Sequence, residues 1–174
     1  MKVLVTVGSK HGASHEIGAA VRTALSDAGV EAVQLPPDEV ASLDGYDAVV
    51  IGSGVYAGRW LDSAKRFVDG HLDELRARPV WLFSSGPLGE PPKPDEEPPD
   101  GKAVAERIGA REHRVFAGSL DKTKLGLGER AIIRMVKAPY GDFRRWPTIE
   151  AWGTASPARS DPDPILTDID ILTE

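Results

Sequence analysis

Short apolar runs alternate with longer segments of helical spacing along the first two thirds of the chain. Residues 48–51 are apolar at every position, which is typical of a parallel strand that is covered on both faces. The other expected strands are residues 3–7, 30–35, 80–83 and 115–117.

Two segments between these runs show the three- and four-residue spacing of one helical face. Residues 17–28 carry it before Gly29, and residues 61–75 carry it after the third strand. Such alternation predicts βαβ units with right-handed crossovers, and therefore a mainly parallel sheet. Five strands favour a doubly wound α/β fold of strand order 2-1-3-4-5, with helices on both faces and ligands bound beyond the carboxyl ends of the strands.

The composition is that of an ordinary globular domain. The chain has 174 residues, enough to bury a full core in one domain, here residues 1–156. Cysteine is absent, which excludes disulfides, thiol nucleophiles and cysteine-bound metal clusters. No apolar stretch reaches the ~20 residues of a membrane span, and residues 1–7 lack the features of a signal peptide, so we expect a cytoplasmic protein.

The net charge of -6 conceals three segments of different sign. Residues 86–101 hold six of the 14 prolines and five acids against one lysine, which predicts a mobile or polyproline-like loop. Residues 157–174 carry five acids and one arginine and are expected to form a flexible tail. Residues 122–145 hold seven basic and two acidic residues, a net charge of +5, in an expected helical insertion. The overall acidity argues against nucleic-acid binding.

The loop after the first strand, residues 8–14, leads into a helix N-terminus. Unpaired N–H groups and the helix dipole attract an anion there, so the loop is expected to seat a phosphate. It has neither the Gly-Lys-Ser/Thr ending of a Walker loop nor the spacing of a dinucleotide turn. The alternative is that Ser14 only caps the helix and that Gly8 and Gly12 only serve turns.

Two further glycine-bearing loops follow the third and fourth strands. Gly52 and Gly54 stand close to Tyr56 and Trp60, a combination that suits the approach of backbone to a flat ring. Alternatively, the two aromatic residues only cover the next helix. Residues 83–89 place another such loop at the same sheet edge. One phosphate seat and two loops that can flank a planar heterocycle favour FMN.

Residues 9–14, 49–56 and 84–87 resemble the phosphate loop and the two flavin-flanking loops of the flavodoxin superfamily. More particularly, the chain resembles the branch that contains the menaquinone-dependent protoporphyrinogen IX dehydrogenases. The similarity covers about residues 1–156 and implies a flavodoxin-like fold around FMN. The resemblance implies that the phosphate is held by Ser9, His11, Gly12, Ala13 and Ser14, with Lys10 as a charge partner, and the ring by Ser53, Gly54, Val55, Tyr56, Ser84, Ser85, Gly86 and Pro87.

The chain departs from short electron-carrier flavodoxins in two places. His11 stands where a threonine is usual, which leaves fewer hydroxyl groups for the phosphate. The basic insertion after the fifth strand indicates a role beyond shuttling electrons.

Within that insertion, residues 129–138 have the pattern of an amphipathic basic helix. Arg130, Arg134 and Lys137 share one face, and apolar residues lie largely opposite them. One interpretation is an ordinary surface helix with a solvated charged face. The functional alternatives are transient contacts with an anionic membrane, which would make the protein peripheral there, with a propionate-bearing porphyrin, or with an acidic protein.

Other chemistry has little support in the sequence. His11 and His15 lack further ligands at metal spacing, and no Ser-His-Asp order stands out, so neither a metal site nor a catalytic side chain is expected. The residues favour FMN-dependent electron transfer or oxidoreduction, with the redox partner or quinone undetermined. A finer interpretation is quinone-linked oxidation of protoporphyrinogen IX, and one of another class is a flavin-free interaction module on the same fold.

Overall fold

A parallel sheet forms the centre of the computed structural model, which describes residues 1–91 and 93–156. Its five main strands lie in the order β2-β1-β3-β5-β6 and pair in parallel. A short strand, β4 (Arg59–Trp60), pairs antiparallel with the end of β3. β4 lies outside this order of main strands. When the five main strands alone are numbered along the chain, their order is 2-1-3-4-5, so the predicted order is confirmed. The main strands are β1 (Lys2–Gly8), β2 (Glu31–Leu35), β3 (Ala48–Tyr56), β5 (Val80–Ser85) and β6 (Glu112–Phe116).

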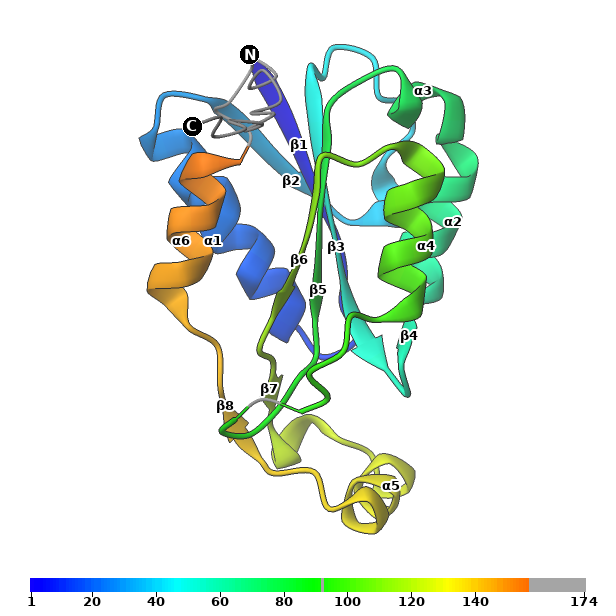
Figure 1. Cartoon of the computed structure of the whole chain (residues 1–174), viewed down its shortest axis with the longest axis vertical. Coiled ribbons are helices and arrows are strands. Elements are labelled where there is room, and N and C mark those ends of the chain that lie inside the picture. Colours follow the sequence, from blue (N-terminus) through cyan, green and yellow to red (C-terminus); the bar gives the residue numbers. More distant parts are fainter. Residues whose placement is uncertain (92, 157–174) are drawn as a thin grey trace, which may run out of the picture.

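Helices cover both faces of the sheet (Figure 1). Since side chains alternate along a strand, Leu4 packs toward one group of helices, whereas Val3 and Val5 pack toward the other. A single 3-10 turn, Pro37–Glu39, follows β2. The face of Val3 and Val5 is covered by α1 (Ala13–Asp27) and α6 (Trp146–Ala155), and the face of Leu4 by α2 (Asp62–Gly70), α3 (Leu72–Arg76) and α4 (Pro99–Ile108).

Gly52 on β3 packs directly against an aromatic ring. It lies opposite Phe83 in the β3–β5 ladder, and a Cβ atom on Gly52 would lie 2.1 Å from Cζ of that ring. The ring of Phe83 in turn contacts those of Phe116 and Trp152, with centroids 5.8 and 6.1 Å away. The core therefore requires a glycine here, independently of any ligand.

The helix expected over residues 61–75 is divided in two. α2 ends at Gly70, and His71 leaves the helical conformation with φ -123° and ψ 23° before α3 begins. Nδ1 of His71 lies 3.0 Å from Oε1 of Glu74, and this hydrogen bond lowers the pKa of the carboxyl group. The apolar spacing continues from α2 into α3 because both helices pack their apolar side chains into the same core cluster.

The proline-rich segment differs from its prediction at two points. Residues 86–91 and 93–98 do lie in a loop, but Leu88 and Lys93 exchange backbone hydrogen bonds of 2.9 and 2.8 Å, so the loop folds back on itself instead of extending as polyproline. Residues 99–101 belong to α4, a helix that was not predicted from the sequence. Pro99 is the first residue of that helix, where its missing N–H costs no hydrogen bond.

Beyond β6 the chain leaves the sheet and forms a small substructure near the carboxyl ends of the strands (Figure 1). Its helix, α5, begins two residues before the helix predicted at 129–138. The predicted tail, residues 157–174, lies outside the described residues. In the part of the chain that the structure describes, no helix is long and apolar enough to cross a membrane. The substructure consists of β7 (Ser119–Leu120), a 3-10 turn (Lys122–Lys124), α5 (Leu127–Val136) and β8 (Gly141–Asp142), with β7 and β8 paired antiparallel.

Candidate functional site

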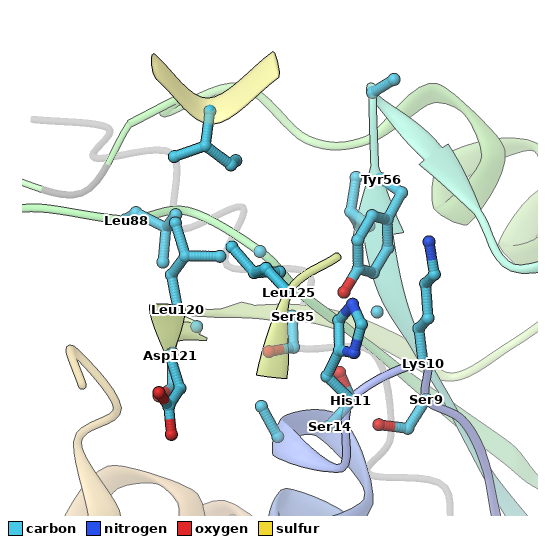
Figure 2. A pocket seen from close by; sticks show the side chains of 18 residues that line it. Ser9, Lys10, His11, Ser14, Tyr56, Ser85, Leu88, Leu120, Asp121 and Leu125 are labelled. Carbon is cyan, nitrogen blue, oxygen red and sulfur yellow. The ribbon is translucent and has the colours of Figure 1, made fainter. Parts of the chain in front are cut away.

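A cleft opens at the carboxyl ends of β1, β3 and β5 (Figure 2). Its walls include the loop between β1 and α1, the end of β3 and the loop after β5, which are the three loops singled out in the sequence. The predicted residues that line the cleft are Ser9, Lys10, His11, Ala13, Ser14, Gly54, Val55, Tyr56, Ser85 and Gly86.

The other predicted residues support these walls without lining the cleft. The hydroxyl group of Ser53 is fully buried and donates to the carbonyl of Gly54 at 2.8 Å. Ser84 is also fully buried. Gly12 precedes the first turn of α1, and the carbonyl of Pro87 accepts a backbone hydrogen bond of 2.8 Å from the segment before β7. These residues position the loops and do not line the cleft.

A fourth wall comes from the chain after β6 and was not among the predicted site residues. The available signal was position: the segment after β6 follows a strand end at the same sheet edge as the other loops. Ile133 reaches the cleft from α5, which no local pattern indicates. The residues of this wall are Gly118, Ser119, Leu120, Asp121, Leu125 and Ile133.

The N-terminus of α1 meets the cleft without a side-chain cap. Its capping position is Gly12, in the left-handed conformation with φ 91°, and Oγ of Ser9 accepts the N–H of Gly12 at 3.1 Å. Ser14 is the second residue of the helix and lines the cleft, so the alternative interpretation of Ser14 as a cap is wrong. Uncapped first-turn N–H groups at a helix N-terminus form an anion seat.

A carboxylate from α5 contacts the side chains of this loop. Oε1 of Glu129 lies 2.5 Å from Nζ of Lys10 and 2.9 Å from Nε2 of His11, and Oε2 accepts the N–H of Gly126 at 2.9 Å. These hydrogen bonds, that from Lys10 above all, lower the pKa of Glu129 from 4.5 to about 2. Glu129 therefore attaches α5 to the loop between β1 and α1 and offsets the charge of Lys10.

Tyr56 extends into the cleft beside the same side chains (Figure 2). Its ring centroid lies 5.3 Å from Nζ of Lys10 and 6.0 Å from the centroid of the His11 ring. Burial, and after it the charge of Glu129, raises the pKa of Tyr56 to about 12. The phenol is therefore protonated at neutral pH, and the side chain keeps an exposed portion of 37% for contact with a ligand.

Arg144 joins the insertion to the start of α1. Its guanidinium lies 2.5 Å from Oε2 of Glu16 and 2.6 Å from Oδ2 of Asp142, and it donates to the carbonyl of Ala13 at 3.1 Å. The hydrogen bonds from Arg144 lower the pKa of Asp142. The sequence showed Arg144 only as one of several basic residues, whereas the structure makes it a buried link between two walls of the site.

A series of hydrogen-bonded polar side chains lies behind the loop that follows β5 and ends at the exposed Glu97. Nε1 of Trp60 donates to Oγ of Ser84 at 2.7 Å, and that oxygen lies 2.8 Å from Nε2 of His113. Nδ1 of His113 lies 2.5 Å from Oε1 of Glu97. The order serine, histidine, carboxylate is that of a hydrolase triad. Ser84, however, is fully buried and does not line the cleft. These hydrogen bonds therefore hold the strand ends and the proline-rich loop in place.

The two histidines at the start of the chain do not converge. Nε2 of His11 contacts Glu129, whereas Nδ1 of His15 lies 3.3 Å from Nε2 of Gln34. Over residues 1–91 and 93–156, no three potential metal ligands form a group.

Comparison with known families agrees with this geometry. The family model described as Flavodoxin domain matches residues 4–145, from β1 through the insertion. The chain belongs to the flavodoxin domain family. Among curated proteins, this flavodoxin-domain chain is similar to Protoporphyrinogen IX dehydrogenase (quinone) of Escherichia coli strain K12. The two are 23% identical over 149 residues, which cover 81% of each chain.

Solved flavodoxins share the fold of this flavodoxin-domain chain. A flavodoxin from the domain Archaea superposes with a TM-score of 0.59 at 14% identity, covering 88% of this chain and 94% of that one. A cysteine-to-serine variant of the flavodoxin from Pseudomonas aeruginosa gives a TM-score of 0.58 at 18% identity, covering 90% and 99%. Both establish a common fold.

Replacing Glu129 by glutamine is expected to loosen α5 in a pH-dependent way. A carboxylate whose pKa is lowered on folding stabilises the fold fully above its ordinary pKa of 4.5 and loses that contribution as the pH falls to about 2. The Tm difference between wild type and E129Q should therefore be constant between about pH 7 and about pH 5, and vanish toward about pH 2. Thermal unfolding followed by circular dichroism measures it.

Glu106 on α4 provides the matched control. It is exposed and has no ion pair within the described ranges, so E106Q should leave Tm unchanged at every pH. A Tm deficit of E129Q that persists undiminished in acid would contradict the assigned role of this carboxylate.

Proposed function

We propose that this chain binds FMN in the cleft and works in electron transfer or as an FMN-dependent oxidoreductase. The observation that carries the proposal is the uncapped N-terminus of α1 at one end of a cleft whose other walls are glycine-bearing strand ends. Membership of the flavodoxin domain family supports it.

The backbone around the cleft suits a planar ring. A Cβ atom on Gly54 would lie 3.0 Å from Oγ of Ser14, and one on Gly86 would lie 3.0 Å from Cβ of Val55. A Cβ atom on Gly118 would lie 3.3 Å from Cα of Gly86. Three loops thus approach one another at positions where side chains have little room, and this leaves flat peptide surfaces for a ring to contact.

The chain's own residues take distinct parts in this proposal. The first turn of α1 holds the phosphate, with Ser9 and Ser14 as hydroxyl donors and Lys10 as the cation. Tyr56 covers the ring as a protonated phenol. The bound flavin supplies the electron and hydride chemistry, and the protein supplies orientation and electrostatics.

Titration of the purified protein, freed of any bound flavin, with FMN and with riboflavin tests the proposal. Quenching of flavin fluorescence and a shift of the visible absorbance bands are expected with FMN. Riboflavin lacks the phosphate and should bind at least about 100-fold more weakly, since a charge-assisted seat contributes several hydrogen bonds of about 1.5–3 kcal/mol each. Equal affinities would contradict the phosphate seat, and absence of binding to both would overturn the cofactor and favour a flavin-free interaction module.

A second candidate is quinone-linked oxidation of protoporphyrinogen IX, in which hydrogen removed from the porphyrinogen converts the quinone to a quinol. The similarity to the Escherichia coli dehydrogenase, over 81% of both chains, favours it. An assay with protoporphyrinogen IX and a menaquinone analogue should show porphyrin fluorescence rising faster with the FMN-loaded protein than with free FMN at equal concentration. No gain over free FMN would remove this candidate.

A further inference from the structure

α5 turns its apolar face to the solvent. None of its residues is buried, and Leu127, Met135 and Val136 are 84%, 75% and 63% exposed. Ile132 is 56% exposed, and Tyr140 just after the helix is 42% exposed. These five account for most of the large hydrophobic side chains that are exposed over the described ranges, the others being at residues 1 and 56.

The inward face of α5 is fixed by two other residues. Glu129 reaches the phosphate loop, and Ile133 lines the cleft one turn further along the same face. Leu127, Ala131 and Met135 follow a four-residue spacing on another face, directed away from the protein. The interpretation of this segment as an ordinary surface helix with a solvated charged face is therefore incomplete, because most of its apolar side chains are exposed as well.

Cations without carboxylate partners flank this apolar face. In the described part of the chain, Lys122, Lys124, Arg130, Arg134 and Lys137 form no ion pair, whereas Lys10 and Arg144 do. Four of the five line a shallow groove with Leu127 and Tyr140. Unpaired cations beside exposed apolar side chains are the two features of a helix that lies in the interface of an anionic bilayer.

We infer that α5, with the cations of its groove, docks this protein onto an anionic lipid bilayer. Leu127, Ile132, Met135 and Val136 enter the boundary between headgroups and acyl chains, while the cations meet lipid phosphates. The inference does not depend on the proposed cofactor.

Charge distinguishes a bilayer from a second copy of this chain. The whole chain carries -6 and residues 122–145 carry +5, so the rest carries -11. An anionic surface repels that remainder and attracts the insertion, which orients the molecule with α5 toward the lipid. A two-fold dimer through α5 would instead place the same cations against each other.

Binding to lipid vesicles tests the inference. The full-length protein should float with vesicles of equal parts phosphatidylglycerol and phosphatidylcholine at low ionic strength, and should be released by high salt or by pure phosphatidylcholine. Each cation near an anionic surface strengthens binding about five-fold. The triple variant R130Q/R134Q/K137Q should therefore bind about 100-fold more weakly, and M135S/V136S should also bind less.

A second triple variant, R22Q/R76Q/K102Q, changes the net charge by the same amount on helices of the main domain, α1, α3 and α4. It should retain vesicle binding, and both triple variants should keep the FMN affinity of wild type, which separates this inference from the cofactor proposal. The inference is overturned if wild type does not bind anionic vesicles, if the control loses as much binding as the α5 variant, or if size-exclusion chromatography shows a dimer that M135S/V136S dissociates.

Discussion

Replacing Ser14 by aspartate is expected to lower the affinity for FMN by at least about 100-fold while leaving the protein folded. The side chain of Ser14 lines the cleft in the first turn of α1, where the proposal places the phosphate. A carboxylate there repels the phosphate dianion at short range and in a partly desolvated site, so the effect exceeds that of a lost hydrogen bond. The helix itself tolerates the change, because an acidic residue in the first turn interacts favourably with the helix dipole.

His15 supplies the control for this experiment. It follows Ser14 in the same turn but is exposed, contacts Gln34 and does not line the cleft. H15D adds a carboxylate at nearly the same distance from the helix end, yet should change FMN affinity by no more than about three-fold, because exposed charges are well screened. Fluorescence titration gives both affinities and thermal unfolding confirms both folds. Equal losses in the two variants would show that the phosphate does not sit at Ser14.

Gly52→Ala is expected to lower the free energy of unfolding by about 1–3 kcal/mol, although it adds only one methyl group. The new Cβ would lie 2.1, 2.4 and 2.6 Å from three atoms of the Phe83 ring. That ring cannot move freely, since Phe116 and Trp152 pack against it. The strain falls two residues before Gly54, so FMN affinity should fall as well.

Urea denaturation measures this loss of unfolding free energy. Two further variants test whether the collision with Phe83 causes it. Gly70, the last residue of α2, has open space where a Cβ would be, so G70A should be neutral or stabilising by up to about 1 kcal/mol. The double variant G52A/F83L replaces the ring by a shorter aliphatic side chain, so it should cost less than the sum of the two single changes, because the collision is relieved. Strict additivity would mean that the contact with Phe83 is not the cause.

The sheet could be predicted because its signal is local. The runs at residues 3–7, 48–51 and 80–83 are buried central strands, and fully apolar runs of that length have few other uses. α4 was missed because its first turn, Pro99–Gly101, continues a proline-rich segment, and only three of its residues are buried. The prolines and acidic residues that precede the helix therefore made residues 86–101 read as one loop.

The cleft was predictable to the extent that it consists of strand ends. Residues 9–11, 13–14, 54–56 and 85–86 reach it because topology brings the carboxyl ends of parallel strands to one edge. Glu129 meets His11 across 118 positions, and Arg144 meets Glu16 across 128. No periodicity encodes such contacts, since each depends on how the insertion folds back over α1.

The orientation of α5 shows a further limit of pattern analysis. An amphipathic pattern defines two faces but not which one packs inward, and the usual assumption buries the apolar face. Here the attachment through Glu129 and Ile133 turns most of the apolar side chains outward. These two contacts thus determine which side chains α5 presents to the solvent.

The two short strands of the insertion have a consequence for how far the length of this segment can vary. Ser119 pairs with Asp142 and Leu120 with Gly141, so the chain departs from the domain and returns to it at adjacent points, as in a hairpin. Lengthening a segment between such closed ends costs little conformational entropy, because the closure cost grows only logarithmically with length. Extra residues added within the 121–140 stretch, away from Glu129 and Ile133, should therefore leave β6 and α6 in their places.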